Sequence, residues 1–134
     1  MRGDDGFGLE LVSGIRGIPI PVIDAGVTPE NHLGAIARHK PGSILVADAA
    51  ELGESPGTLM LLNRGEILGV GGFSTHNMSP AMFMTHLEEL TGASIHMIAV
   101  QPGTTGFGMG LSPEVRARVD QLTEFIRTAV QTER

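Results

Sequence analysis

The chain has 134 residues, the size of one domain, and its hydrophobic fraction of 41% against 18% charged residues is typical of a globular protein. Acidic residues outnumber basic ones by 15 to 9, the net charge is −6, and no basic stripe is present, which argues against a nucleic-acid partner. The lack of cysteine excludes a disulfide framework, a thiolate metal site and a cysteine nucleophile. No apolar stretch approaches the roughly 20 residues that span a bilayer, so we expect a single cytoplasmic domain over residues 1–134.

Three helix starts share one signal, a capping hydroxyl followed by a proline whose missing N–H costs nothing at the first helical position. They are Thr28-Pro29, Ser79-Pro80 and Ser112-Pro113. After the last of them, apolar residues recur at intervals of 3 or 4, as an amphipathic surface helix requires: Val115, Val119, Leu122, Phe125, Ile126 and Val130. We expect this helix to cover one face of a sheet.

Short apolar runs lie between the helices, at residues 43–47, 58–62 and 95–100, and their lack of clean alternation suits strands buried on both faces. A fourth strand is predicted from Ile18 to Ile23, near a sheet edge because its two prolines cannot donate to a ladder. Strands that alternate with helices predict the α/β class, as a three-layer α/β/α arrangement with a mostly parallel central sheet.

Acidic residues directly follow two of the predicted strands. In open α/β sheets, ligands bind beyond the carboxyl ends of the strands, so residues at these positions are candidate site residues. Asp24 follows the run at residues 21–23, and Asp48 follows the run at residues 45–47. We expect both carboxylates to lie at the functional edge of the sheet.

Asp4 and Asp5 lie in a glycine-rich turn, residues 2–8, that leads into a first helix. One interpretation is a helix N-cap with solvated acids. A phosphate-binding loop is a second, but two adjacent acids repel phosphate and the P-loop lysine is missing. His76 lies just before the helix that starts at Pro80, in a polar loop that suits either a surface residue or a metal ligand.

Together, Asp5, Asp48 and His76 form a plausible open coordination set for a borderline divalent metal, with water or substrate completing the shell. Their spacing matches no local metal motif, so only the fold could bring them together. Signatures of serine hydrolases and of the zinc-protease helix are absent from the sequence.

Motifs spread over nearly the whole chain resemble the hydrogenase-maturation endopeptidases, in particular the branch that processes large subunits of the formate-hydrogenlyase and F420-reducing kinds. The pieces occur in the order of that family. They are Gly3-Asp4-Asp5-Gly6-Phe7-Gly8, Val22-Ile23-Asp24-Ala25-Gly26, Pro29-Glu30-Asn31, Leu45-Val46-Ala47-Asp48-Ala49, Pro56-Gly57, Thr75-His76-Asn77-Met78, Val100-Gln101-Pro102 and Gly106-Phe107.

The resemblance implies an aspartic or metal-assisted endopeptidase that removes the C-terminal extension of a [NiFe]-hydrogenase large-subunit precursor. It makes Asp5, Asp48 and His76 the ligands of nickel, which the precursor carries. We hypothesise that Asp5 or Asp48 also takes a proton from the attacking water, with nickel polarising the water or the scissile carbonyl.

Members of that family open with an apolar strand ahead of the glycine-rich loop, whereas Met1 stands almost at that loop here. We therefore expect this chain to lack the family's first strand, so that either the natural start lies upstream or the protein is impaired. This leaves two alternatives open: a degenerate, non-catalytic module that binds a metal or a precursor, and an unrelated α/β hydrolase or nucleotide-binding domain.

Overall fold

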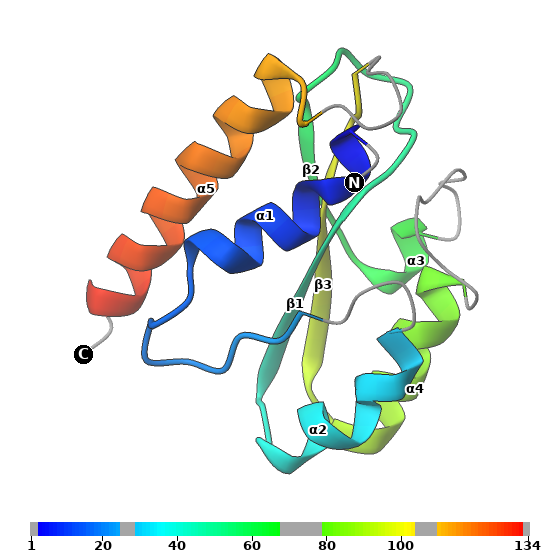
Figure 1. The fold of residues 1–134 in the computed structure, drawn as a ribbon. Coiled ribbons are helices and arrows are strands. Elements are labelled where there is room, and N and C mark those ends of the chain that lie inside the picture. The colour runs from blue at the N-terminus through cyan, green and yellow to red at the C-terminus, as the bar shows by residue number, and fades with distance from the viewer. Residues whose placement is uncertain (1–2, 25–28, 68–78, 104–109, 133–134) are drawn as a thin grey trace.

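The computed structural model describes residues 3–24, 29–67, 79–103 and 110–132. Its elements form three layers, with α1 and α5 on one face of a sheet and α2, α3 and α4 on the other (Figure 1). In chain order they are the 3₁₀ turn η1 (Gly3–Gly6), α1 (Phe7–Gly14), the 3₁₀ turn η2 (Pro29–His32), α2 (Leu33–Arg38), β1 (Ser43–Ala49), β2 (Leu59–Leu62), α3 (Arg64–Ile67), α4 (Pro80–Thr91), β3 (Ser94–Val100) and α5 (Pro113–Thr132). The predicted α/β class is confirmed.

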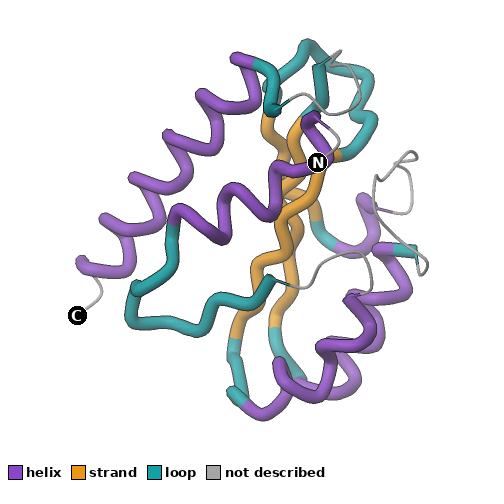
Figure 2. The backbone as a smooth tube through the Cα atoms, viewed as in Figure 1, coloured by secondary structure: helices purple, strands orange, loops and turns teal. Residues whose placement is uncertain are grey.

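The sheet has the strand order β1-β3-β2 and is mixed (Figure 2). β1 pairs with β3 in parallel from Ser43 opposite Ser94 to Ala49 opposite Val100. β2 pairs with β3 antiparallel, starting from Leu59 opposite Val100. A parallel partner needs a long crossover connection, usually a helix. Residues 50–58 contain no helix, so the chain turns back at the same end of the sheet and β2 runs antiparallel.

Side chains of β3 point alternately to the two faces of the sheet, as the period of a strand requires, and contribute to an apolar cluster on each. Ile95, Met97 and Ala99 are buried against the layer of α2, α3 and α4, whose largest contributions come from Phe83, Met84 and Leu87 of α4. Val100 points the other way and packs with Phe7 and Leu11 of α1 and with Val115 and Val119 of α5. Each face of the sheet therefore carries an apolar cluster, but Leu45 of β1 and Leu61 of β2 are 52% and 62% exposed, so these two strands are not buried on both faces as predicted.

Two of the predicted helix starts are confirmed in detail. The Ser79 hydroxyl accepts a hydrogen bond from the Met82 N–H at 3.2 Å, with Pro80 at the first helical position. Ser112 precedes Pro113 of α5, and its hydroxyl accepts from the Val115 N–H at 3.4 Å. Thr28 lies outside the described residues, and the helical turn expected after it begins at Pro29. None of the helices in the described ranges is long and apolar enough to cross a membrane.

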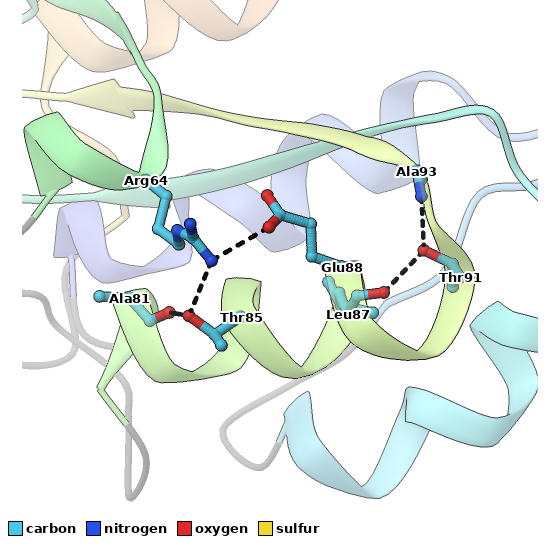
Figure 3. Close-up of polar contacts among 7 residues, drawn as sticks. All are labelled: Arg64, Ala81, Thr85, Leu87, Glu88, Thr91 and Ala93. Carbon is cyan, nitrogen blue, oxygen red and sulfur yellow. Dashed lines mark hydrogen bonds and ion pairs between the residues drawn. The ribbon is translucent and has the colours of Figure 1, made fainter.

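Polar contacts along α4 attach it to α3 and to the turn that precedes β3 (Figure 3). Arg64 of α3 forms an ion pair with Glu88 at 3.0 Å, and its guanidinium also lies 3.5 Å from the Thr85 hydroxyl. At the other end of α4, the Thr91 hydroxyl donates to the Leu87 carbonyl and accepts from the Ala93 N–H. These contacts fix the turn that leads from α4 into β3.

The strand predicted from Ile18 to Ile23 is wrong. Residues 18–24 form bends and irregular chain: Pro19 and Pro21 have no N–H to donate, and none of the described strands pairs with this segment. In the part of the chain that the structure describes, no strand precedes β1, and β1 pairs along only one of its edges.

Candidate functional site at the carboxyl end of the sheet

Asp48 lies at the carboxyl end of β1, opposite Ala99 of β3. The residue is 6% exposed, and its Oδ1 accepts a hydrogen bond from the Ala49 N–H at 2.9 Å. Ala47 and Ala49 pack toward α1 and α5, so alternation along the strand directs Asp48 to the opposite face. Burying a carboxylate costs free energy unless it is hydrogen-bonded. The fold supplies such a donor for Asp48 at this position.

Asp4 holds η1 against the chain that follows β3. It is 2% exposed, and its Oδ1 accepts from the Ser112 N–H at 2.7 Å. Its Oδ2 accepts from the Gly103 N–H at 2.6 Å and from the Ser112 hydroxyl at 2.8 Å. Asp4 is therefore neither solvated nor a helix cap, and the residue at the cap of α1 is Gly6, with no side-chain hydrogen bond.

Gln101 follows β3 directly and is 5% exposed. Its Oε1 accepts from the N–H groups of Leu52 and Glu54, at 2.7 and 3.3 Å. Its Nε2 donates to Glu51 Oε2 at 3.0 Å and to the Pro102 carbonyl at 3.2 Å. All the hydrogen-bonding capacity of the amide is used within one edge of the sheet.

The buried polar or charged residues in the described ranges are Asp4, Asp48, Gln101 and Ser112. Asp48 and Gln101 end neighbouring parallel strands, and Asp4 and Ser112 join that edge through Gly103. The carboxyl end of the sheet therefore gathers the buried polar groups, as expected for the ligand-binding edge of an α/β sheet.

Glycines allow the first helix and the site segments to come close. A Cβ added at Gly8 would lie 2.9 Å from the Ala47 carbonyl oxygen, so α1 rests directly on β1 just before Asp48. A Cβ added at Gly103 would lie 3.2 Å from the Ser112 hydroxyl and 3.4 Å from the Asp4 carboxylate. The glycine-rich turn and α1 thus pack closely on the carboxyl end of the sheet.

Of the predicted trio, the structure describes the side chain of Asp48 alone. Asp5 belongs to η1, beside Asp4, but its side chain lies outside the described part, and His76 lies wholly outside it. The described residues contain no group of three His, Cys, Asp or Glu able to hold a metal ion. The trio therefore stays a prediction as a set.

The strand from which Asp24 was predicted to lie at the sheet edge does not form, and Asp24 is exposed. The sequence reasoning assigned no role to Gln101 and missed the buried position of Asp4. Gln101 could have been found by the rule that singled out Asp48, since it directly follows the apolar run at residues 95–100. Asp4 gave no comparable signal, because its partners lie about a hundred positions away in the sequence.

The fold is that of the hydrogenase maturation proteases, as two solved structures show. The crystal structure of the [NiFe] hydrogenase maturation protease HycI from Thermococcus kodakarensis superimposes with a TM-score of 0.85 at 28% identity, over 97% of this chain and 85% of that chain. The solution structure of the endopeptidase HycI from Escherichia coli gives a TM-score of 0.81 at 28% identity, over 96% and 83%.

Sequence comparison identifies the family. The Escherichia coli hydrogenase 3 maturation protease is 31% identical over 123 residues, which are 90% of this chain and 78% of that protein. The sequence model of the HycI family, described as hydrogenase maturation protease, matches residues 16–129. This chain belongs to that family. The match includes Asp48 and His76 and begins after the glycine-rich turn that carries Asp4 and Asp5.

Proposed function

We propose that this chain is an endopeptidase that removes the C-terminal extension of a [NiFe]-hydrogenase large-subunit precursor after nickel has been inserted. The observation that carries the proposal is Asp48, a buried carboxylate at the carboxyl end of a strand, in a chain of the hydrogenase maturation protease family. That position is where α/β sheets present reactive groups to a ligand.

In this proposal, Asp5, Asp48 and His76 contact the nickel that the precursor carries. Carboxylate oxygen and imidazole nitrogen suit a borderline divalent ion, and an incomplete protein shell leaves positions for donors from the precursor. Nickel in the substrate would supply Lewis-acid help at the scissile carbonyl or at the attacking water. Metal already inserted in the precursor then becomes a condition for cleavage.

The chain's own residues would supply the proton transfer. We assign the acceptance of a proton from the attacking water to Asp48 or Asp5. A shared site for these two acids is supported by their place at the same end of the sheet, because Asp48 lies near the end of β1 and Asp4, next to Asp5, binds the Gly103 N–H after β3. General-base catalysis by a positioned carboxylate raises a reaction rate about 10²- to 10⁴-fold. We expect removal of that carboxylate to lower the cleavage rate by a factor in this range.

The test mixes the purified protein with a nickel-loaded large-subunit precursor and follows intact mass for loss of the C-terminal peptide. We expect cleavage of the nickel-loaded precursor, none of the nickel-free precursor, and a loss of at least about 100-fold in the Asp48→Asn and His76→Ala variants. Asp120→Asn, a matched change at an exposed acid of α5, should cut at the wild-type rate.

Each other outcome has a distinct meaning. Wild-type cleavage by Asp48→Asn would remove Asp48 from the mechanism, and equal cleavage of both precursors would remove the nickel condition. Stable binding of the nickel-loaded precursor without any cleavage would establish the alternative of a non-catalytic binding module.

A further inference from the structure

The three residues that follow β3, Gln101 to Gly103, lie between the two acid-bearing segments of the candidate site. Building on the function proposed above, we propose that Gln101 is a positioning residue for the cleavage reaction. Its side chain fixes the segment after Asp48, and Gly103, two positions further on, fixes the turn that carries Asp5. The relative position of the two acids would then be set by this one segment.

The amide of Gln101 can take only one orientation. Its Oε1 faces the N–H donors of Leu52 and Glu54, whereas its Nε2 faces the acceptors Glu51 Oε2 and the Pro102 carbonyl. A flipped amide would place the Nε2 donor against two N–H groups and the Oε1 acceptor against two oxygens. The side chain therefore holds residues 51–54 in a single arrangement.

Backbone hydrogen bonds of Val100 and Gln101 hold the rest of the loop formed by residues 50–58. The Ala50 N–H donates to the Val100 carbonyl at 3.0 Å, directly after the paired end of β1. The Gly57 N–H donates to the Gln101 carbonyl at 2.8 Å, and the Gln101 N–H donates to the Thr58 carbonyl at 2.9 Å. Residues 50–58 are thus attached to the end of β3 along their length, and the strand end that carries Asp48 is attached with them.

The second acid-bearing segment is attached by Asp4. Its carboxylate accepts from Gly103 and from both donors of Ser112, and the next residue in η1 is Asp5. Hydrogen bonds to a buried carboxylate are short and strong, and a fully satisfied network in a low-dielectric site is rigid. Such rigidity has a use in catalysis, since a misplacement of about 1 Å can lower a rate about 100-fold.

The decisive experiment replaces the donor in one hydrogen bond of the Gln101 side chain with an acceptor. In Gln101→Glu, Oε1 still accepts from Leu52 and Glu54, but a second carboxylate oxygen faces Glu51 at the present 3.0 Å. Repulsion should displace residues 51–54 and lower kcat about 100-fold, with little change in KM, because a misplaced group slows the bound complex. Adding Glu51→Gln lets the new amide donate to the new carboxylate, and this should recover about tenfold in kcat.

Gln121→Glu is the matched control, because it makes the same chemical change on the exposed surface of α5, beside Arg118. It should leave kcat unchanged. Rates are compared per folded molecule, with the folded fraction taken from urea unfolding. The proposal is overturned if Gln101→Glu cuts at the wild-type rate, if its loss equals its loss of folded protein, or if adding Glu51→Gln recovers nothing.

Amide hydrogen exchange separates this proposal from the proposed function. The Leu52 and Glu54 N–H groups should exchange faster in Gln101→Glu and slow again when Glu51→Gln is added, whether or not any precursor is cut. Unchanged exchange at both amides would contradict the positioning role even in an active protease. Failure of the wild-type protein to cut nickel-loaded precursor, with the exchange pattern as expected, would instead count against the proposed function alone.

Discussion

The two ends of the sheet are held in different ways. At the carboxyl end, the connecting segments are fixed by the side chains of Asp4, Gln101 and Ser112, all of which are buried. At the amino end, the Ser94 N–H donates to the Gly42 carbonyl at 3.0 Å, and the turns there use positive φ angles at Lys40 and Gly92. Ser43 and Ser94, which begin β1 and β3, are exposed.

This difference separates the demands of folding from those of a site. Backbone hydrogen bonds, tight turns and the partly buried hydroxyl of Thr91 close the amino end. Buried polar side chains lose their hydration and must be matched group by group. Among the described residues, such side chains are concentrated at the carboxyl end, in greater number than a reversal of the chain requires. They fix the positions of the connecting segments at this end.

The largest effect on stability is expected from Asp4→Ala. The change leaves the Gly103 N–H and both donors of Ser112 without their acceptor at a buried position. Each orphaned donor is costly, so we expect a loss of about 3 kcal/mol in the free energy of unfolding, measured by urea denaturation. A loss below about 1 kcal/mol would show that water replaces the carboxylate and that this end is no more demanding than the other.

Replacing one glycine at each end of the sheet with alanine compares the two ends directly. Gly57 at the carboxyl end and Gly92 at the amino end have φ angles of +87° and +69°. Both substitutions strain the backbone, at about 1–2 kcal/mol, but an added Cβ at Gly57 would also lie 3.0 Å from Glu114 Cβ, whereas Gly92 has open space. Gly57→Ala should therefore destabilise the protein more than Gly92→Ala, as read from their urea midpoints. Equal midpoints would mean that the carboxyl end relaxes freely.

The smallest effect is expected from Lys40→Gly at the amino end. Lys40 is a non-glycine residue with a φ of +49°, and glycine removes that strain while adding freedom to the unfolded chain. The two contributions nearly cancel, so the free energy of unfolding should rise by no more than about 0.5 kcal/mol. Cleavage of precursor should not change, and a clear loss of activity would contradict the view that this end serves folding only.

Local signals in the sequence predicted much of the fold. The runs at residues 43–47, 58–62 and 95–100 became β1, β2 and β3, and Ser79 and Ser112 cap the helices that follow them. The segment from Ile18 to Ile23 failed because a strand depends on its neighbours as well as on its own composition. The antiparallel direction of β2 followed from a short connection and not from the pattern of its residues.

The site was less predictable, because its contacts join distant positions. Asp48 could be found from its place after an apolar run, and the same rule applied to Gln101 would have placed it at the edge. No local pattern shows that Asp4 is buried, since its burial depends on Gly103 and Ser112. The side chains of Asp5 and His76 lie outside the described part, so their roles rest on the motifs.

The bonds from Asp4 to Ser112 also set an order of events during synthesis. Chains emerge from the ribosome with the N-terminus first, so a carboxylate at position 4 must wait until residue 112 has been made before its buried partners exist. β1 and β3 can pair somewhat earlier, once residue 100 has been made. The edge that carries Asp48 is therefore completed only when nearly the whole chain is available, and a nascent protein has no finished site to act with.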